Sequence, residues 1–203
     1  MVYFAKDLQT SYEFFINDPV LMELAGDILT HPEFIGMGEF YSHKYEIRLK
    51  HLMNVAYYSV KLSRFLRGDT ETTLRAALLH DFYPYQRYKK DTNYVKHLKT
   101  HAGESLANAQ NFFLLSSEVQ EIILRHHWPF TRGKPKRAEA FIVISVDWIV
   151  ATMENFYHRG WRNPKNAVRV VGRKSKQGMK FVGKKTKNGA KKISSKVLPN
   201  KKI

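Results

Sequence analysis

Cysteine is absent from this 203-residue chain. This absence excludes disulfide bonds, thiolate metal sites and cysteine nucleophiles. Long apolar runs are missing too, because Asp147 interrupts the most apolar stretch, residues 141–151, and a membrane span needs ~18 apolar residues. The first fifteen residues lack a basic segment followed by an apolar core, so they do not resemble a signal peptide. We therefore expect a cytoplasmic protein without a membrane span.

Acidic residues are absent from residues 165–203. The whole chain has 34 Lys and Arg residues and 18 Asp and Glu residues, for a net charge of +16. Fourteen of the basic residues lie in 165–203, which leaves 20 basic and 18 acidic residues in 1–164. The charge therefore predicts a nearly neutral domain over 1–164 and a basic tail, and it disfavours a uniformly basic protein that coats nucleic acid.

The tail is rich in lysine and glycine, and the pattern at residues 171–178 recurs at 182–189. Such a composition cannot bury a core, so we expect a disordered tail. Its cations suit the phosphate backbone of nucleic acid, bound without sequence specificity. Anionic lipid and a merely solubilising extension are the alternatives. The residues that we expect to contact nucleic acid are Arg173, Lys174, Lys176, Lys184, Lys185 and Lys187.

Residues 1–164 are long enough to bury the core of one domain. Leu52, Val55 and Leu62 recur at three- and four-residue spacing and predict a helix over 47–66. No segment alternates as a strand does, so we predict an all-α fold. Five further helices are predicted from their start signals: Asp18-Pro19, a Thr70 cap, a Thr100 cap, a Ser117-x-x-Gln120 capping box and a start near Ala138. On the last of these helices, one apolar stripe is expected to consist of Phe141, Ile144, Trp148 and Ala151. The aromatic residues expected in the core are Phe113, Trp148 and Phe156.

Polar residues stand at positions that these helices should bury. His51 shares a helix face with Val55, His80-Asp81 follows the apolar run 76–79, and Asp147 interrupts an apolar helix. Burying a charged carboxylate is costly unless it is paired or binds a metal ion. One divalent ion would satisfy all these positions at once.

Each of these polar positions, taken alone, can also be accounted for without a metal ion. A single buried histidine is more often a core residue than a ligand, and Asp147 could pair with an inward-facing Arg48 or Arg125. A set of imidazoles and carboxylates suits Mn, Fe, Ni, Co or Zn, and Mg less well. A second ion would need about three further nitrogens, which His101 and the His126-His127 pair could supply. We therefore expect one or two divalent metal ions.

Three segments resemble the H…HD…D signature of the HD superfamily of metal-dependent phosphohydrolases. They are Arg48-x-x-His51, Ala77-Leu-Leu-His-Asp81 and the apolar helix with Asp147. The resemblance covers about 44–157 and extends to His97-x-x-x-His101 and Ile122-Ile-Leu-Arg-His126-x-Trp-Pro129, which are similar to a branch of small, largely uncharacterised bacterial HD proteins. It implies an HD-domain helical bundle.

The resemblance also implies roles for individual residues. The core metal ligands would be His51, His80, Asp81 and Asp147, and those of a second ion would be His101 and His126. In the same comparison Asp81 orients the attacking water. His101, His127 or His97 would protonate the leaving oxygen, because imidazole can exchange protons near neutral pH. The residues that would support the site or neutralise substrate phosphate are Arg48, Lys96, Lys99 and Arg132, although the last three could equally be solvated surface charges.

The segment Phe82-Tyr83-Pro84-Tyr85 departs from the small continuation found in better-known HD branches. The resemblance therefore does not extend to a cyclic-dinucleotide substrate. The function that the sequence predicts is a metal-dependent phosphohydrolase acting on a nucleotide or another phosphate ester. The alternatives are a non-catalytic module that senses metal or nucleotide, and a protein that associates with nucleic acid through its basic tail.

Overall fold

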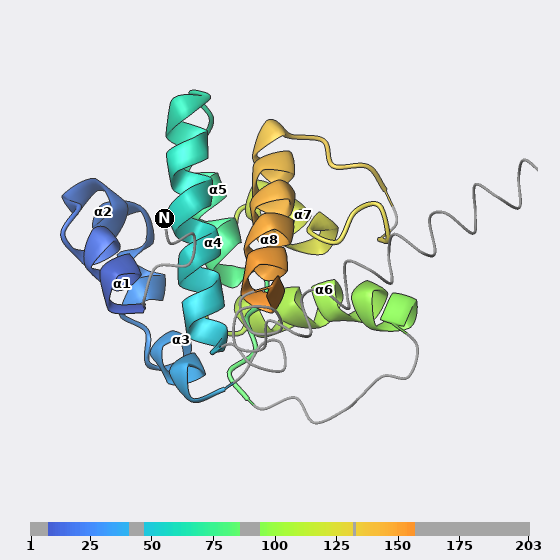
Figure 1. The fold of residues 1–203 in the computed structure, drawn as a ribbon, viewed down its shortest axis with the longest axis horizontal. Helices are drawn as coiled ribbons and strands as arrows, with labels where there is room; N and C mark the ends of the chain where they lie inside the picture. The colour runs from blue at the N-terminus through green and yellow to red at the C-terminus, as the bar shows by residue number, and fades with distance from the viewer. Residues whose placement is uncertain (1–7, 41–46, 86–93, 132, 157–203) are drawn as a thin grey trace, which may run out of the picture. The chain divides into compact units, whose positions relative to one another are not determined.

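The computed structural model of the protein describes residues 8–40, 47–85, 94–131 and 133–156, and of residues 8–10 and 94–99 it describes the backbone alone. Within these ranges the chain forms helices and no strand, so the predicted all-α fold is confirmed (Figure 1). The elements are α1 (Leu8–Ile16), α2 (Pro19–Leu29), α3 (Pro32–Gly36), the 3-10 helix η1 (Met37–Glu39), α4 (Arg48–Phe65), α5 (Thr70–Leu79), α6 (Tyr94–Gln110), α7 (Ser117–Arg125) and α8 (Ala138–Phe156).

The chain divides into two units, residues 1–155 and 156–203. Of the second unit the structure describes only Phe156, the last residue of α8. The basic tail at 165–203 and its predicted contacts with nucleic acid therefore lie outside the described residues.

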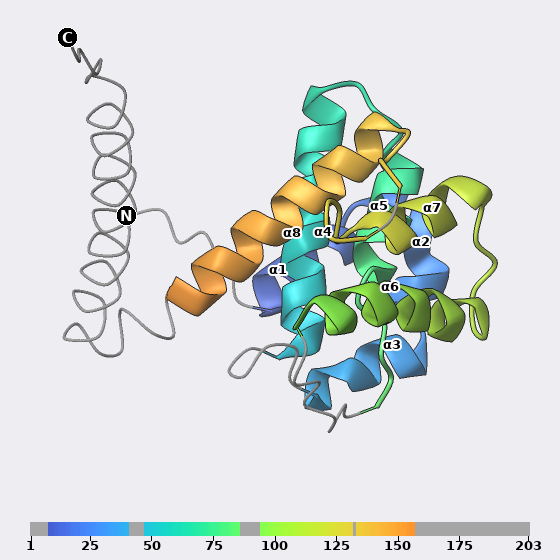
Figure 2. The same ribbon diagram turned by 90° about the vertical axis from the view of Figure 1, so that its right-hand side faces the viewer.

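Helix α4 lies at the centre of the first unit. It packs against α5, α1 and η1, and α8 crosses it while α6 runs crosswise near one of its ends (Figures 1 and 2). Its buried side chains lie on most of its circumference, because neighbours cover it on several sides. The helix that carries His51 is therefore held from several directions.

One apolar cluster joins these helices. It includes Leu21 of α2, Leu52 of α4, Leu74 of α5, Ile122 of α7 and Val143 of α8, all fully buried. Each such side chain contributes about 1.5–3 kcal/mol to folding through its burial. The cluster thereby holds in register the helices that also carry the buried polar residues.

The observed helix caps correct two predictions. Asp18 caps α2 as predicted, since its carboxylate accepts from the backbone N–H groups of the first turn. The prediction that Thr70 is the N-cap of α5 was wrong. Asp69 has the extended backbone of an N-cap, and its carboxylate accepts a hydrogen bond from the Thr72 N–H at 3.0 Å. The predicted N-cap at Ser117 was also wrong, by one residue, because Ser116 is the N-cap of α7. Two adjacent residues can both supply a capping oxygen, and backbone conformation decides between them.

Two further expectations about helices were wrong. Helix α6 begins at Tyr94 and not at Thr100. Helix α8 has nearly the predicted bounds, but Trp148 and Phe156 are 46% and 57% exposed and do not belong to the core, whereas Phe113 is buried as expected. Because α8 is apolar on most of its surface, spacing alone could not identify its buried face.

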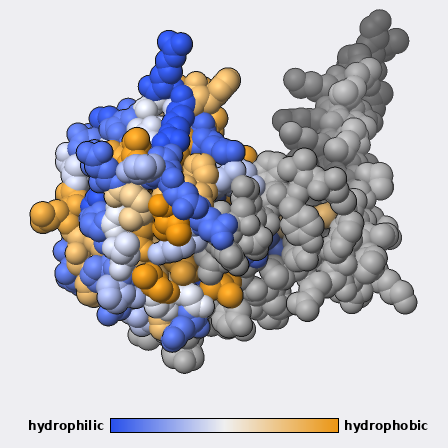
Figure 3. All heavy atoms as spheres, turned by 90° about the vertical axis from the view of Figure 1, so that its left-hand side faces the viewer, coloured by the Kyte–Doolittle hydropathy of each residue, from blue (hydrophilic) through white to orange (hydrophobic). Residues whose placement is uncertain are grey.

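The surface seen from the side of α1 and α2 mixes hydrophobic and hydrophilic residues (Figure 3). Exposed apolar side chains such as Val20 and Ile35 are ordinary on a folded protein. In the ranges that the structure describes, none of the helices combines the length and the apolar character needed to cross a membrane.

Helix α4 ends in a Schellman motif. The Gly68 N–H donates to the Ser63 carbonyl at 2.9 Å, and the Arg67 N–H donates to the Arg64 carbonyl at 3.3 Å. Such a motif places its penultimate residue in the left-handed region, and here that residue is Arg67, with φ of 57°. The sequence indicated the helix stop correctly at Gly68, but the strained position is the one before it.

Replacing Arg67 with glycine should therefore stabilise the fold. The Arg67→Gly variant removes the Cβ that is strained at positive φ, and its free energy of unfolding should rise by about 1 kcal/mol in urea titrations. Arg67→Ala is the matched control: it removes the same charge but keeps the Cβ, so its stability should stay close to that of the wild type. Equal stability of the glycine and alanine variants would contradict the assignment.

Candidate metal centre

The structure brings together side chains from five helical segments. α4 supplies His51, the end of α5 supplies His80 and Asp81, and α8 supplies Asp147. α6 supplies His101, and the residues that follow α7 supply His126 and His127. His80 and His126 are each the C-cap of their helix, which turns their rings back towards the preceding turn. All the predicted ligand side chains therefore lie in one place.

Three of these residues form the first part of the cluster. His51 Nε2 lies 3.1 Å from Asp147 Oδ1, and His80 Nε2 lies 3.6 Å from the same oxygen. The ligand atoms of His51, His80 and Asp81 also lie within 4.8 Å of one another. His51 and His80 are fully buried, so bulk solvent does not reach their ring nitrogens.

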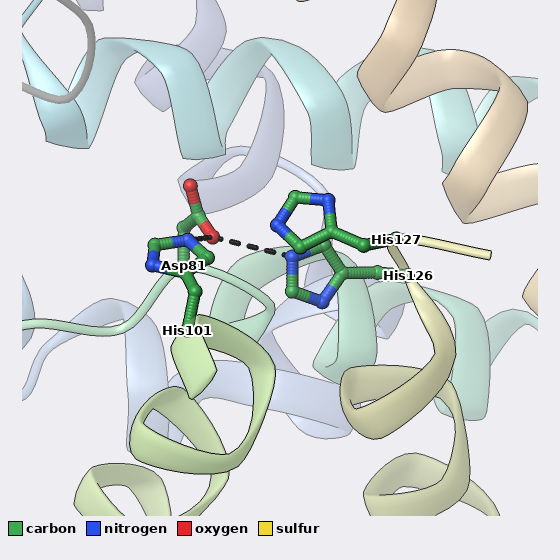
Figure 4. A group of neighbouring side chains, drawn as sticks. All are labelled: Asp81, His101, His126 and His127. Carbon is green, nitrogen blue, oxygen red and sulfur yellow. Dashed lines mark hydrogen bonds and ion pairs between the residues drawn. The ribbon is translucent and has the colours of Figure 1, made fainter. Parts of the chain in front are cut away.

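A second part surrounds Asp81. Its Oδ1 lies 2.5 Å from His101 Nε2 and 3.4 Å from His126 Nε2 (Figure 4). Asp81, His101, His126 and His127 offer ligand atoms that all lie within 4.8 Å of one another. Asp81 thus belongs to both groups and links them, as a carboxylate shared between two ions would.

The backbone orients two of the imidazoles. His80 Nδ1 lies 2.8 Å from the Ala77 carbonyl oxygen, and His126 Nδ1 lies 2.6 Å from the Ile123 carbonyl oxygen. A carbonyl only accepts hydrogen bonds, so Nδ1 carries the proton in both rings. In the neutral ring Nε2 then has a lone pair. This atom faces Asp147 in His80 and Asp81 in His126.

Glu154 orients His51 and was missed in the sequence. Its Oε2 lies 2.9 Å from His51 Nδ1, and the carboxylate is almost fully buried. A carboxylate in this position fixes the ring and raises its basicity as a ligand. The available signal was spacing: Glu154 follows Asp147 by two helical turns, which puts both carboxylates on one face of an apolar helix.

The donor set fits a divalent transition-metal ion. His80 Nε2 and His126 Nε2 are buried without a hydrogen-bond partner, and each buried unsatisfied group costs about 1–3 kcal/mol. Two lone pairs that face each other across 3.4–3.6 Å repel, unless a proton or cation lies between them. Imidazole nitrogens with carboxylate oxygens suit Mn, Fe, Co, Ni or Zn.

Burial and neighbouring charges shift the pKa values of this cluster in opposite directions. Burial lowers the pKa of His51, but the Glu154 and Asp147 carboxylates outweigh it and hold that pKa well above 6.5. Burial also lowers the pKa of His80, and Asp81 with Asp147 raises it overall. Conversely, burial raises the pKa of Asp147, yet His51 and His80 hold it well below its usual range. Without a metal ion, protons supply the positive charge.

His127 differs from its neighbours. Its ring centroid lies 3.8 Å from that of His126. Burial, and then the charge of His126, lowers the pKa of His127 to about 2. The ring is therefore uncharged at neutral pH, which suits a ligand or a proton acceptor better than the proton donor that was among its predicted roles.

Arg48 is buried beside the cluster. Its Nη1 donates to the carbonyl oxygens of Tyr83 and Tyr85. The guanidinium therefore holds the segment that follows Asp81, and its contact with substrate phosphate stays a prediction. Arg125, the other arginine considered as a partner of Asp147, lies 3.8 Å from Glu121.

The remaining predicted substrate contacts cannot be placed by their side chains. Lys96, His97 and Lys99 belong to the first turns of α6, where the structure describes the backbone alone. Arg132 lies outside the described residues.

Comparison with known families gave one finding. The model of the HD domain family matches residues 48–152, which is about half of the chain and spans α4 to α8. Searches of curated proteins and of solved structures found no match. The matched range includes every residue of the cluster, from His51 to Asp147.

Metal affinity should rise with pH. Because neighbouring carboxylates hold the pKa of His51 well above 6.5 and raise that of His80 in the folded protein, these rings bind protons more tightly than a free imidazole does, and a cation must displace those protons when it binds. The competition is strongest at low pH and ends once pH has passed the raised pKa values. Calorimetric titration with Mn²⁺ from pH 6 to 8.5, in buffers that differ in ionisation enthalpy, should show proton release and tighter binding at higher pH. An affinity independent of pH would contradict this.

Removing the charge of Glu154 should weaken metal binding without removing a ligand. In Glu154→Gln the affinity for Mn²⁺ should fall by about 10–100-fold, the usual effect of losing a residue that orients a metal-binding histidine. Glu118→Gln removes a carboxylate from a partly exposed position in α7 and should leave the affinity unchanged. Equal affinities of the two variants would show that Glu154 does not act through His51.

Proposed function

Because the chain belongs to the HD domain family, whose members are generally metal-dependent hydrolases, we propose that it hydrolyses a nucleotide or another phosphate ester. The observation that carries the proposal is the arrangement of the imidazoles. Nε2 atoms of four histidines converge on Asp81 and Asp147, the two carboxylates that they share. Such a set is what a divalent ion needs for tight binding.

The ligands of the ion, or of two ions, would be His51, His80, Asp81, His101, His126 and Asp147. A bound divalent ion supplies Lewis acidity towards phosphoryl oxygens and lowers the pKa of a water molecule towards neutrality. Its identity is proposed only as a class: Mn, Fe, Ni, Co, Zn or, less favoured by histidine-rich sites, Mg.

The protein groups would position the water and receive its proton. Although burial raises the pKa of Asp81, His101 and His80 hold it well below its usual range, so its carboxylate remains an acceptor at neutral pH and can orient the attacking water. His97 is the proposed donor to the leaving oxygen when His101 holds a second ion, and His101 is proposed for that role only in a site with one ion, where its Nε2 shares a proton with Asp81. Arg48, Lys96 and Arg132 are proposed to neutralise phosphate. His127 is proposed as a further ligand or acceptor because its ring is uncharged.

The alternatives differ in what the same protein would do. A module that only senses metal or nucleotide would bind the ion and hydrolyse nothing. The fourteen cations of residues 165–203 keep nonspecific nucleic-acid binding as a separate proposal for the tail. Counterion release makes such binding strongly dependent on salt, whereas the chemistry of a buried metal site is not.

Removing the shared carboxylate tests the proposal. Wild-type protein loaded with Mn²⁺ should release phosphate from a generic phosphomonoester or from a member of a nucleotide panel. In Asp81→Asn, kcat/KM should fall by at least ~100-fold, because loss of a ligand costs no less than loss of a group that orients one. The kcat/KM of His80→Ala should fall by a similar factor.

The control is Asp27→Asn, which removes a carboxylate that pairs with Arg75 on the surface between α2 and α5. Its kcat/KM should match that of the wild type. Full metal content and full activity in Asp81→Asn would overturn the proposed site. Metal binding without hydrolysis of any substrate would instead support the sensing module.

A further inference from the structure

Tyr83 lies two residues after Asp81, in the segment where the sequence departs from better-known HD proteins. Its side chain is buried, with only 1% of the residue exposed. The ring stacks on His101, with centroids 4.9 Å apart and planes at 20°. Its hydroxyl reaches both the carbonyl oxygen and the Nδ1 atom of His101, the latter at 2.9 Å.

These two contacts determine where the protons lie. A carbonyl oxygen can only accept, so the Tyr83 hydroxyl donates its single proton to the His101 carbonyl. The hydroxyl oxygen must then accept from His101 Nδ1, which therefore carries a proton. The other ring nitrogen, Nε2, is the one that faces Asp81 at 2.5 Å. When a cation replaces the proton between these two atoms, Nε2 is the nitrogen free to bind it.

His101 needs this support more than the other ligands do. His80 and His126 are held by carbonyl groups of their own helices, and His51 is held by Glu154. His101 is also the most exposed of these four imidazoles, since the other three are fully buried and 12% of its side chain is exposed.

Arg48 holds Tyr83 in turn. Its Nη1 donates to the Tyr83 carbonyl, and its guanidinium carbon lies 5.6 Å from the centre of the Tyr83 ring. A buried guanidinium with two carbonyl partners fixes the backbone of the segment. The contacts therefore run from the first turn of α4, through Tyr83, to a ring on α6.

We infer that Tyr83 is a positioning residue that presents His101 Nε2 to a second divalent ion held by Asp81, His101 and His126. The inference rests on the proposed metal-dependent function and adds a division of labour: the ion near His51, His80 and Asp147 is independent of Tyr83, and the ion near His101 depends on it.

The test counts ions. Metal-free wild-type protein titrated with Mn²⁺ in a calorimeter should bind two ions. Tyr83→Phe keeps the ring and removes only the hydroxyl, and it should bind one ion with wild-type affinity and the other about 10–100-fold more weakly. Tyr85→Phe is the matched control, because the Tyr85 hydroxyl contacts Asn108 and not a ligand. It should bind both ions as the wild type does.

A double-variant cycle separates positioning from a general structural effect. His101→Ala should lose the same ion, and adding Tyr83→Phe to it should change the affinity for the remaining ion by less than twofold. A further loss in the double variant, or two tightly bound ions in Tyr83→Phe, would overturn the inference. One ion in the wild type would also overturn it while leaving the proposed hydrolase intact. No bound ion in the wild type would overturn the proposed function itself.

Discussion

The attraction between two buried carboxylates and the imidazoles around them is the interaction on which this structure depends. Asp81 and Asp147 lie in an interior formed by the helices α4 to α8, where an unpaired charge would be expensive. Histidines from the neighbouring helices lie beside these carboxylates, and the Nε2 atoms of His80 and His126 are buried without a hydrogen-bond partner. The buried interior that makes these charges costly also strengthens the binding of a cation between them, so the packing of the core and the affinity of the site depend on each other.

Helix ends explain how the ligands reach one point. His80 and His126 each cap a helix, and their rings bond to the carbonyl three residues earlier. The apolar cluster of α2, α4, α5, α7 and α8 fixes the positions of these ends. Packing therefore contributes to the chemistry by aiming side chains that the local backbone has already oriented.

Three kinds of support hold the imidazoles, and each has a different consequence. Backbone carbonyls hold two rings without the aid of any side chain, a carboxylate holds His51, and a phenol holds His101. The carboxylate adds negative charge and so favours an ion near His51. The phenol of Tyr83 orients the His101 ring and adds no charge. The two halves of the cluster thereby differ in electrostatics although both present nitrogen and carboxylate oxygen.

Sequence patterns predicted the helical class of the fold and the residues that the structure brings together in the cluster. Helical periodicity marks the apolar faces, and a histidine or aspartate inside such a face signals a buried polar group that needs a partner. The groups that orient the ligands became visible only in the packed structure. Glu154 meets His51 across 103 positions and Tyr83 meets His101 across 18, and local patterns carry no information about such distant contacts. The buried face of α8 was also decided there, because a helix apolar on most sides acquires its inner face only from the neighbours that cover it.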